Sequence, residues 1–215
     1  MTRPTASCPN CGAAIEFRWS GAVQTTCAYC HSILVRQDVR LERVGEVADL
    51  PPDSSPIQLG TEGRYGGSRF VVVGRIIYDY EHGTWNEWHL TMLDGASAWL
   101  SDAQLEFALS HHEQAPGGLP AAHDVEPGRS YHWKGTEYLV TTVTRAHYRG
   151  VEGELPFEYW DKQEVLFADL ATHGGGFATI DYSETPPILF LGAYVGYDEL
   201  ALTNVRQFAG WPVPS

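Results

Sequence analysis

Short apolar runs and alternating polar and apolar positions recur through most of this 215-residue chain, a pattern typical of β-strands. The clearest run is 69–78, where β-branched and aromatic residues dominate, and 138–143 and 188–191 are similar. Residues 101–104 have the form of a helix capping box, but the alternating positions that follow favour a turn into a strand. The pattern therefore predicts a mainly β fold with few helices.

Two stretches rich in proline, glycine and polar residues divide the chain. Residues 48–56 contain three prolines and predict a linker, and residues 113–123 predict a connector. We therefore expect a small module with its following connector at 1–47, a first β-unit at 57–112 and a second at 124–215. The two units are expected to be barrel-like or sandwich-like, either as separate domains or as one domain.

The two predicted β-units resemble each other in sequence. A turn and apolar strand at 62–73 parallel those at 127–141, and the aromatic segment 85–88 has a looser counterpart at 157–160. The offset grows from 65 to 72 residues, so a repeat would need insertions in the turns. The alternative is that two unrelated meander sheets share a turn, an apolar strand and an aromatic strand.

The four cysteines of the chain form two Cys-x-x-Cys pairs separated by fifteen residues: Cys8, Cys11, Cys27 and Cys30. This is the ligand spacing of a zinc ribbon. A module of about 35 residues buries too little apolar surface to fold without a metal or another staple. We predict one structural Zn²⁺ bound by four thiolates, which leave no open position for a catalytic water.

Three other interpretations of the cysteines are weaker. A disulfide pair would need an oxidising compartment, and residues 1–7 lack the apolar segment of a signal peptide. A thioredoxin-like site would have a single Cys-x-x-Cys between a strand and a helix. His31 directly follows Cys30 and is a candidate ligand in competition with the cysteines. Since no apolar run approaches the roughly 20 residues of a membrane span, we expect a cytoplasmic protein.

The net charge of −13 is unevenly distributed along the chain. Residues 1–45 have a net charge of +2, whereas residues 46–215 have a net charge of −15. An acidic body repels phosphates, so we expect neither nucleic acid nor a membrane surface as its partner. Contact between nucleic acid and the weakly basic N-terminal module is an alternative, and membrane association would require a protein partner.

Several segments resemble the bacterial domain-of-unknown-function family 4178. They are the string 63–78, the Trp-Asn-Glu-Trp box at 85–88, the turn 94–95, the element 99–101 and the late segment 187–202. Together they cover roughly residues 57–206. The resemblance implies a bacterial, cytosolic, β-rich protein with no assigned reaction, encoded beside small membrane proteins and aminopropyltransferase-like enzymes. That setting suits an accessory or assembly role.

The Trp-Asn-Glu-Trp box suggests a recognition surface. On a strand, Trp85 and Glu87 share one face while Trp88 faces the other way. With Arg75 on a neighbouring strand, these residues are the candidate partner or ligand surface. The alternative is that Trp88 and Trp99 anchor a core and Glu87 pairs with an arginine.

Signatures of catalysis are weak. The His-Gly-Gly-Gly string at 173–176 matches an oxyanion loop of some lipases, but no Gly-x-Ser-x-Gly motif accompanies it, so we predict a hairpin turn. A second metal site formed by histidines with Glu113 is a weak alternative, because these histidines lack metal-site spacing; they are His111, His112, His123 and His132.

The sequence therefore predicts a non-enzymatic zinc-binding scaffold or adaptor that contacts another protein in a larger assembly. Seven Trp and eleven Tyr would suit interface anchors. The alternative is a hydrolase-like enzyme with a pocket in the β-body, using Glu87, a histidine or the pair 181–182 as acid–base groups. A deep cavity with converging titratable groups would favour the enzyme, and exposed aromatic surfaces would favour the scaffold.

Overall fold

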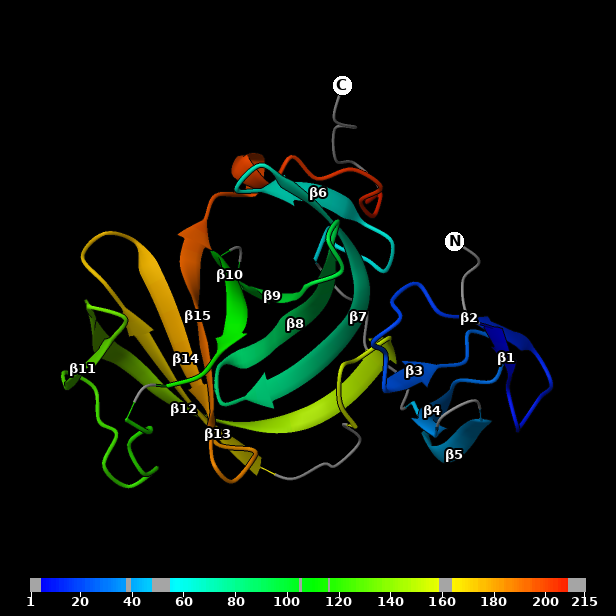
Figure 1. Ribbon diagram of the computed structural model, residues 1–215, viewed down its shortest axis with the longest axis horizontal. Coiled ribbons are helices and arrows are strands. Elements are labelled where there is room, and N and C mark those ends of the chain that lie inside the picture. Colours follow the sequence, from blue (N-terminus) through cyan, green and yellow to red (C-terminus); the bar gives the residue numbers. More distant parts are fainter. Residues whose placement is uncertain are drawn as a thin grey trace.

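The architecture is mainly β, as the sequence pattern predicts. The computed structural model describes residues 5–37, 40–47, 55–104, 106–115, 117–158 and 164–208. These ranges contain fifteen strands and one 3-10 helix (Figure 1). Within them, no helix has the length and apolar character needed to cross a membrane. The predicted linker 48–56 lies outside the described residues except for its last two positions.

The N-terminal module, called the ribbon below, consists of two small antiparallel sheets. Its strands are β1 (Thr5–Ser7), β2 (Ala14–Glu16), β3 (Gln24–Thr26), β4 (Ser32–Gln37) and β5 (Arg40–Glu46). β1 pairs with β2, and β3, β4 and β5 form the second sheet. Ile15, Phe17 and Leu34 are buried with Cys8 and Cys27. The ribbon core is therefore small and includes two of the cysteines.

The remaining strands form one continuous antiparallel sheet. The first half contains β6 (Glu62–Tyr65), β7 (Ser68–Tyr80), β8 (Gly83–Met92), β9 (Ser97–Ala103) and β10 (Glu106–Glu113). The second half contains β11 (Ser130–Trp133), β12 (Thr136–Gly153), β13 (Glu164–Ala171), β14 (Gly176–Asp181) and β15 (Ile188–Val195), followed by the 3-10 helix η1 (Tyr197–Leu200). β12 pairs with β7 as well as with β13, so β7–β10 and β12–β15 close into a ring of eight strands (Figure 1).

The two halves of the ring have the same strand order. Each is a short strand, a long strand and three further strands joined as an antiparallel meander. The two halves join at two places, and corresponding strands pair at each: β7 pairs with β12, and β10 pairs with β15. The two predicted β-units thus share one closed sheet with approximate two-fold symmetry. The unit boundaries at 57–112 and 124–215 stay predictions.

Two apolar layers cover the outside of the ring, one on each half. On the first half, Trp88 packs with Ile57, which precedes β6, and with Leu200 of η1. On the second half, Ile180 packs with Trp133 of β11. Because side chains alternate along a strand, the neighbours of these outward residues point into the ring. Those inward positions line the interior described below.

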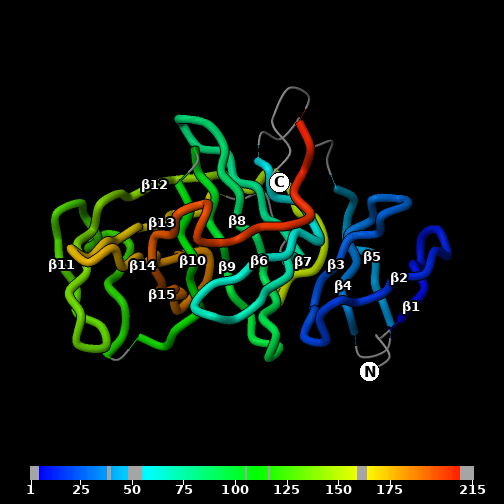
Figure 2. Tube along the Cα trace, turned by 90° about the horizontal axis from the view of Figure 1, so that it is seen from above, coloured from blue at the N-terminus to red at the C-terminus, as the bar shows by residue number. Residues whose placement is uncertain are grey.

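The ribbon packs on the outside of the ring at the end of β12 (Figure 2). Glu154 is 4% exposed, and its two carboxylate oxygens accept hydrogen bonds from the backbone amides of Arg18 at 2.7 Å and Trp19 at 2.8 Å. Gln24 of β3 forms an isolated antiparallel bridge with Leu155. Charge-assisted bonds to a buried carboxylate are among the stronger hydrogen bonds, so Glu154 fixes the position of the ribbon.

An aromatic contact extends this interface toward the ring interior. The Trp19 ring meets the His89 ring edge-on at 4.9 Å, and Trp99 lies 5.1 Å beyond His89. The Nδ1–H of His89 donates to the Glu154 carbonyl at 2.8 Å, which leaves Nε2 to accept from Ser97 Oγ at 2.8 Å. Burial lowers the pKa of His89 to about 4. The imidazole is therefore neutral at physiological pH.

Candidate functional site

The four predicted cysteine ligands converge in the ribbon. Their Sγ atoms all lie within 4.8 Å of one another, with Cys8–Cys30 and Cys11–Cys27 both at 3.7 Å. A disulfide would require a sulfur–sulfur distance of about 2.05 Å, so these are free thiols. Tetrahedral coordination with metal–sulfur bonds of about 2.3 Å separates the sulfurs by roughly 3.8 Å. The cluster therefore has the number and spacing of ligands that one metal ion requires.

Both cysteine pairs sit in turns of the same form. The Cys8 carbonyl accepts from the Gly12 amide and the Cys27 carbonyl accepts from the His31 amide, each at 2.9 Å. Gly12 and His31 both have left-handed backbones, with φ of 77° and 55°. The His31 side chain is exposed and is not part of the thiol cluster. His31 thus occupies a position whose geometry favours glycine.

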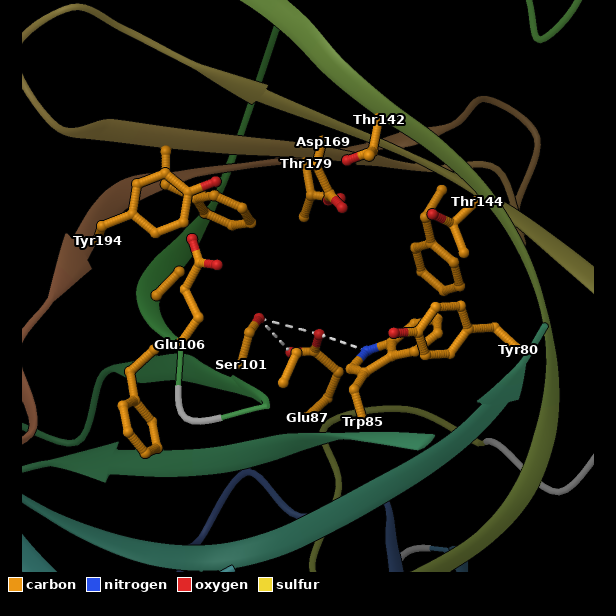
Figure 3. A pocket seen from close by; sticks show the side chains of 15 residues that line it. Tyr80, Trp85, Glu87, Ser101, Glu106, Thr142, Thr144, Asp169, Thr179 and Tyr194 are labelled. Atoms are coloured by element: carbon orange, nitrogen blue, oxygen red, sulfur yellow. Dashed lines mark hydrogen bonds between the residues drawn. The ribbon is translucent and has the colours of Figure 1, made fainter. Parts of the chain in front are cut away.

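A cavity of about 240 Å³ lies inside the ring (Figure 3). Every ring strand contributes to its wall, including Tyr80, Trp85, Ser101, Glu106, Thr142, Phe167, Phe177 and Tyr194. Glu106 and Thr142 are exposed at its rim, whereas Phe177 is buried. The volume suits a ligand smaller than a typical drug-sized molecule.

Two carboxylate–hydroxyl pairs face each other across this cavity (Figure 3). Glu87 of β8 is directly opposite Ser101 of β9 in the strand register and accepts its hydroxyl hydrogen bond at 2.8–2.9 Å. Asp169 of β13 is directly opposite Thr179 of β14 and is hydrogen-bonded to that hydroxyl. β8–β9 and β13–β14 are corresponding hairpins of the two halves, but the two pairs are not equivalent positions. Matching turn hydrogen bonds, Met92–Ala96 and Thr172–Gly176, place Phe167 at the position of Glu87 and His89 at the position of Asp169.

The surroundings disfavour the charged form of both carboxyl groups. Burial raises the pKa of Glu87 to about 8, and the nearby charges of Asp169 and Asp181 add to the effect. Hydrogen bonds from Ser101 and from the Trp85 indole nitrogen, at 3.0 Å, oppose it. Burial likewise raises the pKa of Asp169 to about 6. Without a cationic partner, Glu87 is therefore mostly protonated at neutral pH.

Aromatic rings complete the cavity wall. Trp85 stacks on Tyr78 with ring centroids at 4.9 Å and meets Tyr80 edge-on at 5.3 Å, and Phe177 packs against Tyr194 at 5.2 Å. Burial raises the pKa of Tyr194 to about 12, so its phenol stays neutral. These rings give the cavity apolar surfaces between the carboxyl groups.

A third acidic group lies in the inner part of the ring. Asp181 lines a smaller cavity of about 40 Å³ together with Ser110 and Phe190, and Glu87 borders both cavities. Burial raises the pKa of Asp181, while the Ser183 amide donates to its Oδ1 at 2.7 Å. The inner cavity is about the size that ordered water fills.

The structure separates the four residues of the predicted recognition surface. Trp85 and Glu87 line the cavity, whereas Trp88 and Arg75 are buried on the opposite face of the sheet. The Arg75 guanidinium lies 4.7 Å from the Trp88 ring and donates to Asn86 and Glu152. Arg75 is therefore part of the outer layer and is not the partner of Glu87.

The remaining sequence candidates do not assemble into a site. Residues 172–175 connect β13 to β14, so the predicted hairpin turn at the His-Gly-Gly-Gly string is confirmed. Within the described ranges, the four cysteines are the one group placed to bind a metal ion, and the histidines near 111–132 are not part of such a group. Asp181 does lie in the ring, but Tyr182 points to the outer layer, where its hydroxyl donates to the Pro120 carbonyl at 3.1 Å.

Sequence reasoning did not identify Asp169, Ser101 and Thr179 as site residues. The repeat carries no signal for them, because the positions equivalent to Asp169 and Thr179 are His89 and Trp99. No local pattern shows that their strands line one cavity, so these residues are identified only once the strand pairing is known.

Comparison with known proteins supports the family resemblance found in the sequence. Residues 58–196 match the family described as domain of unknown function DUF4178. No curated protein and no solved structure matches the chain. The matched residues span most of the ring, from the segment before β6 to the end of β15. The chain therefore belongs to the DUF4178 family.

Proposed function

We propose that the ring of this protein binds a small organic cation, and that a diammonium compound fits the cavity best. The observation that carries the proposal is the presence of two carboxylate–hydroxyl pairs, Glu87–Ser101 and Asp169–Thr179, on facing walls. An ammonium group donates three hydrogen bonds and is attracted to aromatic faces. Each pair offers oxygen acceptors for one ammonium group, and the aromatic wall covers the carbon chain between them.

The charge of the cavity supports a cation and disfavours an anion. Among the cavity-lining residues of the described chain, Glu87, Glu106 and Asp169 are acidic and none is Lys, Arg or His. The net charge of −15 over residues 46–215 also concentrates cations near the body.

Cation binding is linked to proton release in this proposal. The raised pKa values of Glu87 and Asp169 show that the ionised carboxylates lack compensation in the free protein. A bound ammonium group supplies that compensation and lowers both pKa values. Binding therefore releases protons and strengthens as the pH rises toward the pKa of Glu87.

We favour binding over the hydrolase alternative. The converging carboxyl groups are what a hydrolase pocket would show, but acid–base catalysis also needs a nucleophile or an activated water. The described lining includes neither Cys nor Lys nor His, and the Ser101 hydroxyl donates to Glu87. The wall is thus better suited to recognise a cation than to activate a nucleophile.

We also propose that the cysteine centre binds one Zn²⁺ ion. Four thiolates with tetrahedral spacing suit zinc, and a closed thiolate shell is structural. Elemental analysis of purified protein should find one zinc per chain. Iron in place of zinc would contradict the assignment.

Exposed tryptophan side chains do not support the predicted adaptor role. Every described tryptophan is buried or half-buried: Trp19, Trp85, Trp88, Trp99 and Trp133. An adaptor function and a protein partner stay proposals, supported by the groove described in the next subsection. The cytoplasmic location also stays a prediction.

Calorimetric titration of the full-length protein tests the cation proposal. Diaminobutane, butylammonium and choline serve as test cations, and butanediol and succinate serve as the neutral and anionic controls. We expect at least one cation to bind, with Glu87→Gln and Asp169→Asn each lowering affinity by about tenfold or more. Glu137→Gln, which changes an exposed carboxylate outside the cavity, is the matched control. Heats that are equal for cations and controls would overturn the proposal.

A further inference from the structure

A second, larger depression of about 1030 Å³ lies between the ribbon and the ring. Its wall on the ribbon side is the loop after β2, with Phe17, Arg18 and Trp19. Its wall on the ring side comes from β6, β7 and the end of β8. We call this depression the ribbon groove. It is separate from the interior cavity, since no residue lines both.

Three arginines line the ribbon groove: Arg18, Arg64 and Arg69. Arg64 and Arg69 are directly opposite each other in the β6–β7 hairpin, so they share one face of the sheet. Like charges at such positions destabilise a hairpin. All three side chains are exposed, and none forms an ion pair within the described part of the chain. Most other described arginines of the ring do have carboxylate partners, such as Arg145 with Glu164 and Arg149 with Asp79.

The Arg18 guanidinium extends from the ribbon toward the ring. Gly60 makes room for it, since a β-carbon there would lie 2.9 Å from Arg18 Nη1. The single carboxylate in the groove lining is Glu62 of β6, against three guanidinium groups. In a protein with a net charge of −13, this is a local excess of positive charge.

The groove also has an apolar edge. Leu93, in the turn after β8, is 81% exposed, the highest value among the large apolar side chains described. Met92 and Gly95 line the groove beside it, and the Trp19 indole nitrogen donates to the Gly95 carbonyl at 3.0 Å. An exposed leucine next to unpaired arginines is typical of a site that closes on a partner.

We propose that the ribbon groove binds an extended acidic segment of a partner protein, with two or more carboxylates and an apolar side chain. The carboxylates would pair with Arg64, Arg69 and Arg18, and the apolar side chain would cover Leu93. Arginine suits this role because its planar guanidinium binds carboxylates through two parallel hydrogen bonds. The inference does not depend on the cation proposal, because the two sites share no residues.

A short acidic peptide fits better than nucleic acid. A nucleic acid extends past the groove and would meet the acidic body, with its net charge of −15 over residues 46–215. A short peptide segment places its few charges within the groove alone. The apolar edge at Leu93 also lacks a counterpart in a phosphate backbone.

Selection from a random peptide display library on the immobilised full-length protein tests this inference. We expect enriched peptides to contain several Asp or Glu and at least one large apolar residue. A synthetic peptide of the enriched sequence should bind the double variant Arg64→Gln/Arg69→Gln at least about tenfold more weakly. Leu93→Ser should weaken binding by a smaller factor.

The matched control is Arg43→Gln/Arg145→Gln, which changes the net charge equally at exposed positions outside the groove. This control should bind the peptide as the wild type does. Retained circular dichroism and melting temperature show that each variant folds. Three results would overturn the inference. They are no enrichment of acidic peptides, equal losses of peptide affinity in both double variants, or tighter binding of a single-stranded oligonucleotide that depends on Arg64 and Arg69 and displaces the peptide.

Discussion

Glu87 and Asp169 lie on facing walls of the ring, and each is hydrogen-bonded to the hydroxyl directly across from it on the next strand. The cavity therefore has a carboxylate–hydroxyl pair on each of these two walls. A ligand with two similar cationic ends would use both pairs at once. Once one ammonium group is bound, the other is already held near the second pair, so its binding is intramolecular.

Glu87→Gln should stabilise the protein at alkaline pH. The folded-state pKa of Glu87, about 8, lies above its ordinary value, so the folded protein retains a proton that the unfolded chain releases between these pH values. Stability contributed by this group is therefore present at acidic pH and is lost as the pH rises toward about 8. Glutamine mimics the protonated form and cannot ionise.

Melting temperatures at several pH values check this prediction. At pH near 9 the variant should melt at least about 3 °C above the wild type, which corresponds to roughly 1 kcal/mol for a chain of this length. Near pH 5 the two proteins should melt alike. Glu137→Gln should shift neither value. A variant that is destabilised equally at every pH would show that Glu87 is structural and ionised.

Removal of the metal should unfold the ribbon and leave the ring folded. The ribbon core consists of a few apolar side chains packed around Cys8 and Cys27, and thiolate–metal bonds supply most of its folding free energy. The ring has its own apolar layers on the outside. Chelation at neutral pH, or Cys27→Ser, should expose the amides of β1–β5 to hydrogen exchange while those of β8 and β13 stay protected. Simultaneous loss of protection in both parts would contradict this account.

Glu154 should be the largest single contributor to ribbon docking. Its buried carboxylate accepts the amides of Arg18 and Trp19, and removal leaves two partly buried donors without this partner. Glu154→Ala should cost about 2–4 kcal/mol of unfolding free energy, and Glu154→Gln, which retains one acceptor oxygen, should cost less. Denaturant unfolding followed by tryptophan fluorescence measures both. Equal losses in the two variants would show that charge, and not acceptor number, decides the interaction.

His31→Gly should stabilise the protein, because His31 has the left-handed backbone that Gly12 adopts in the first cysteine turn. Glycine avoids the steric cost of a β-carbon in this region, and the gain should be about 0.5–1 kcal/mol. Gly12→Ala is the reverse change at the corresponding position and should destabilise by a similar amount. Zinc affinity of the two variants, measured by competition with a chelator, should change in the same directions. A loss of affinity in His31→Gly would indicate that His31 contributes to the metal centre.

The sequence predicts the local features well and the closed sheet poorly. Cysteine spacing identifies the ligand cluster, and strand periodicity places Trp85 and Glu87 on one face. Ring closure depends on the pairing of β7 with β12, whose residues are about seventy positions apart, so no local pattern reports it.

The same long-range pairing decides what each side chain faces. Arg75 and Glu87 lie on neighbouring strands, but a register that places Arg75 opposite Trp88 sends the two charges to opposite faces of the sheet. Asp169 and Thr179 join the site only when the ring closes, which is why sequence alone leaves them out.

The central claim is that a cation displaces protons from the facing carboxyl groups. Calorimetric titration of wild-type protein with the best-binding test cation near pH 7, in phosphate and in Tris, measures this directly, because the two buffers differ in ionisation enthalpy. The pKa of Glu87, about 8, predicts release of about one proton per ligand, and the release should vanish in Glu87→Gln. Binding heats that are the same in both buffers, or proton release that persists in Glu87→Gln, would contradict the account.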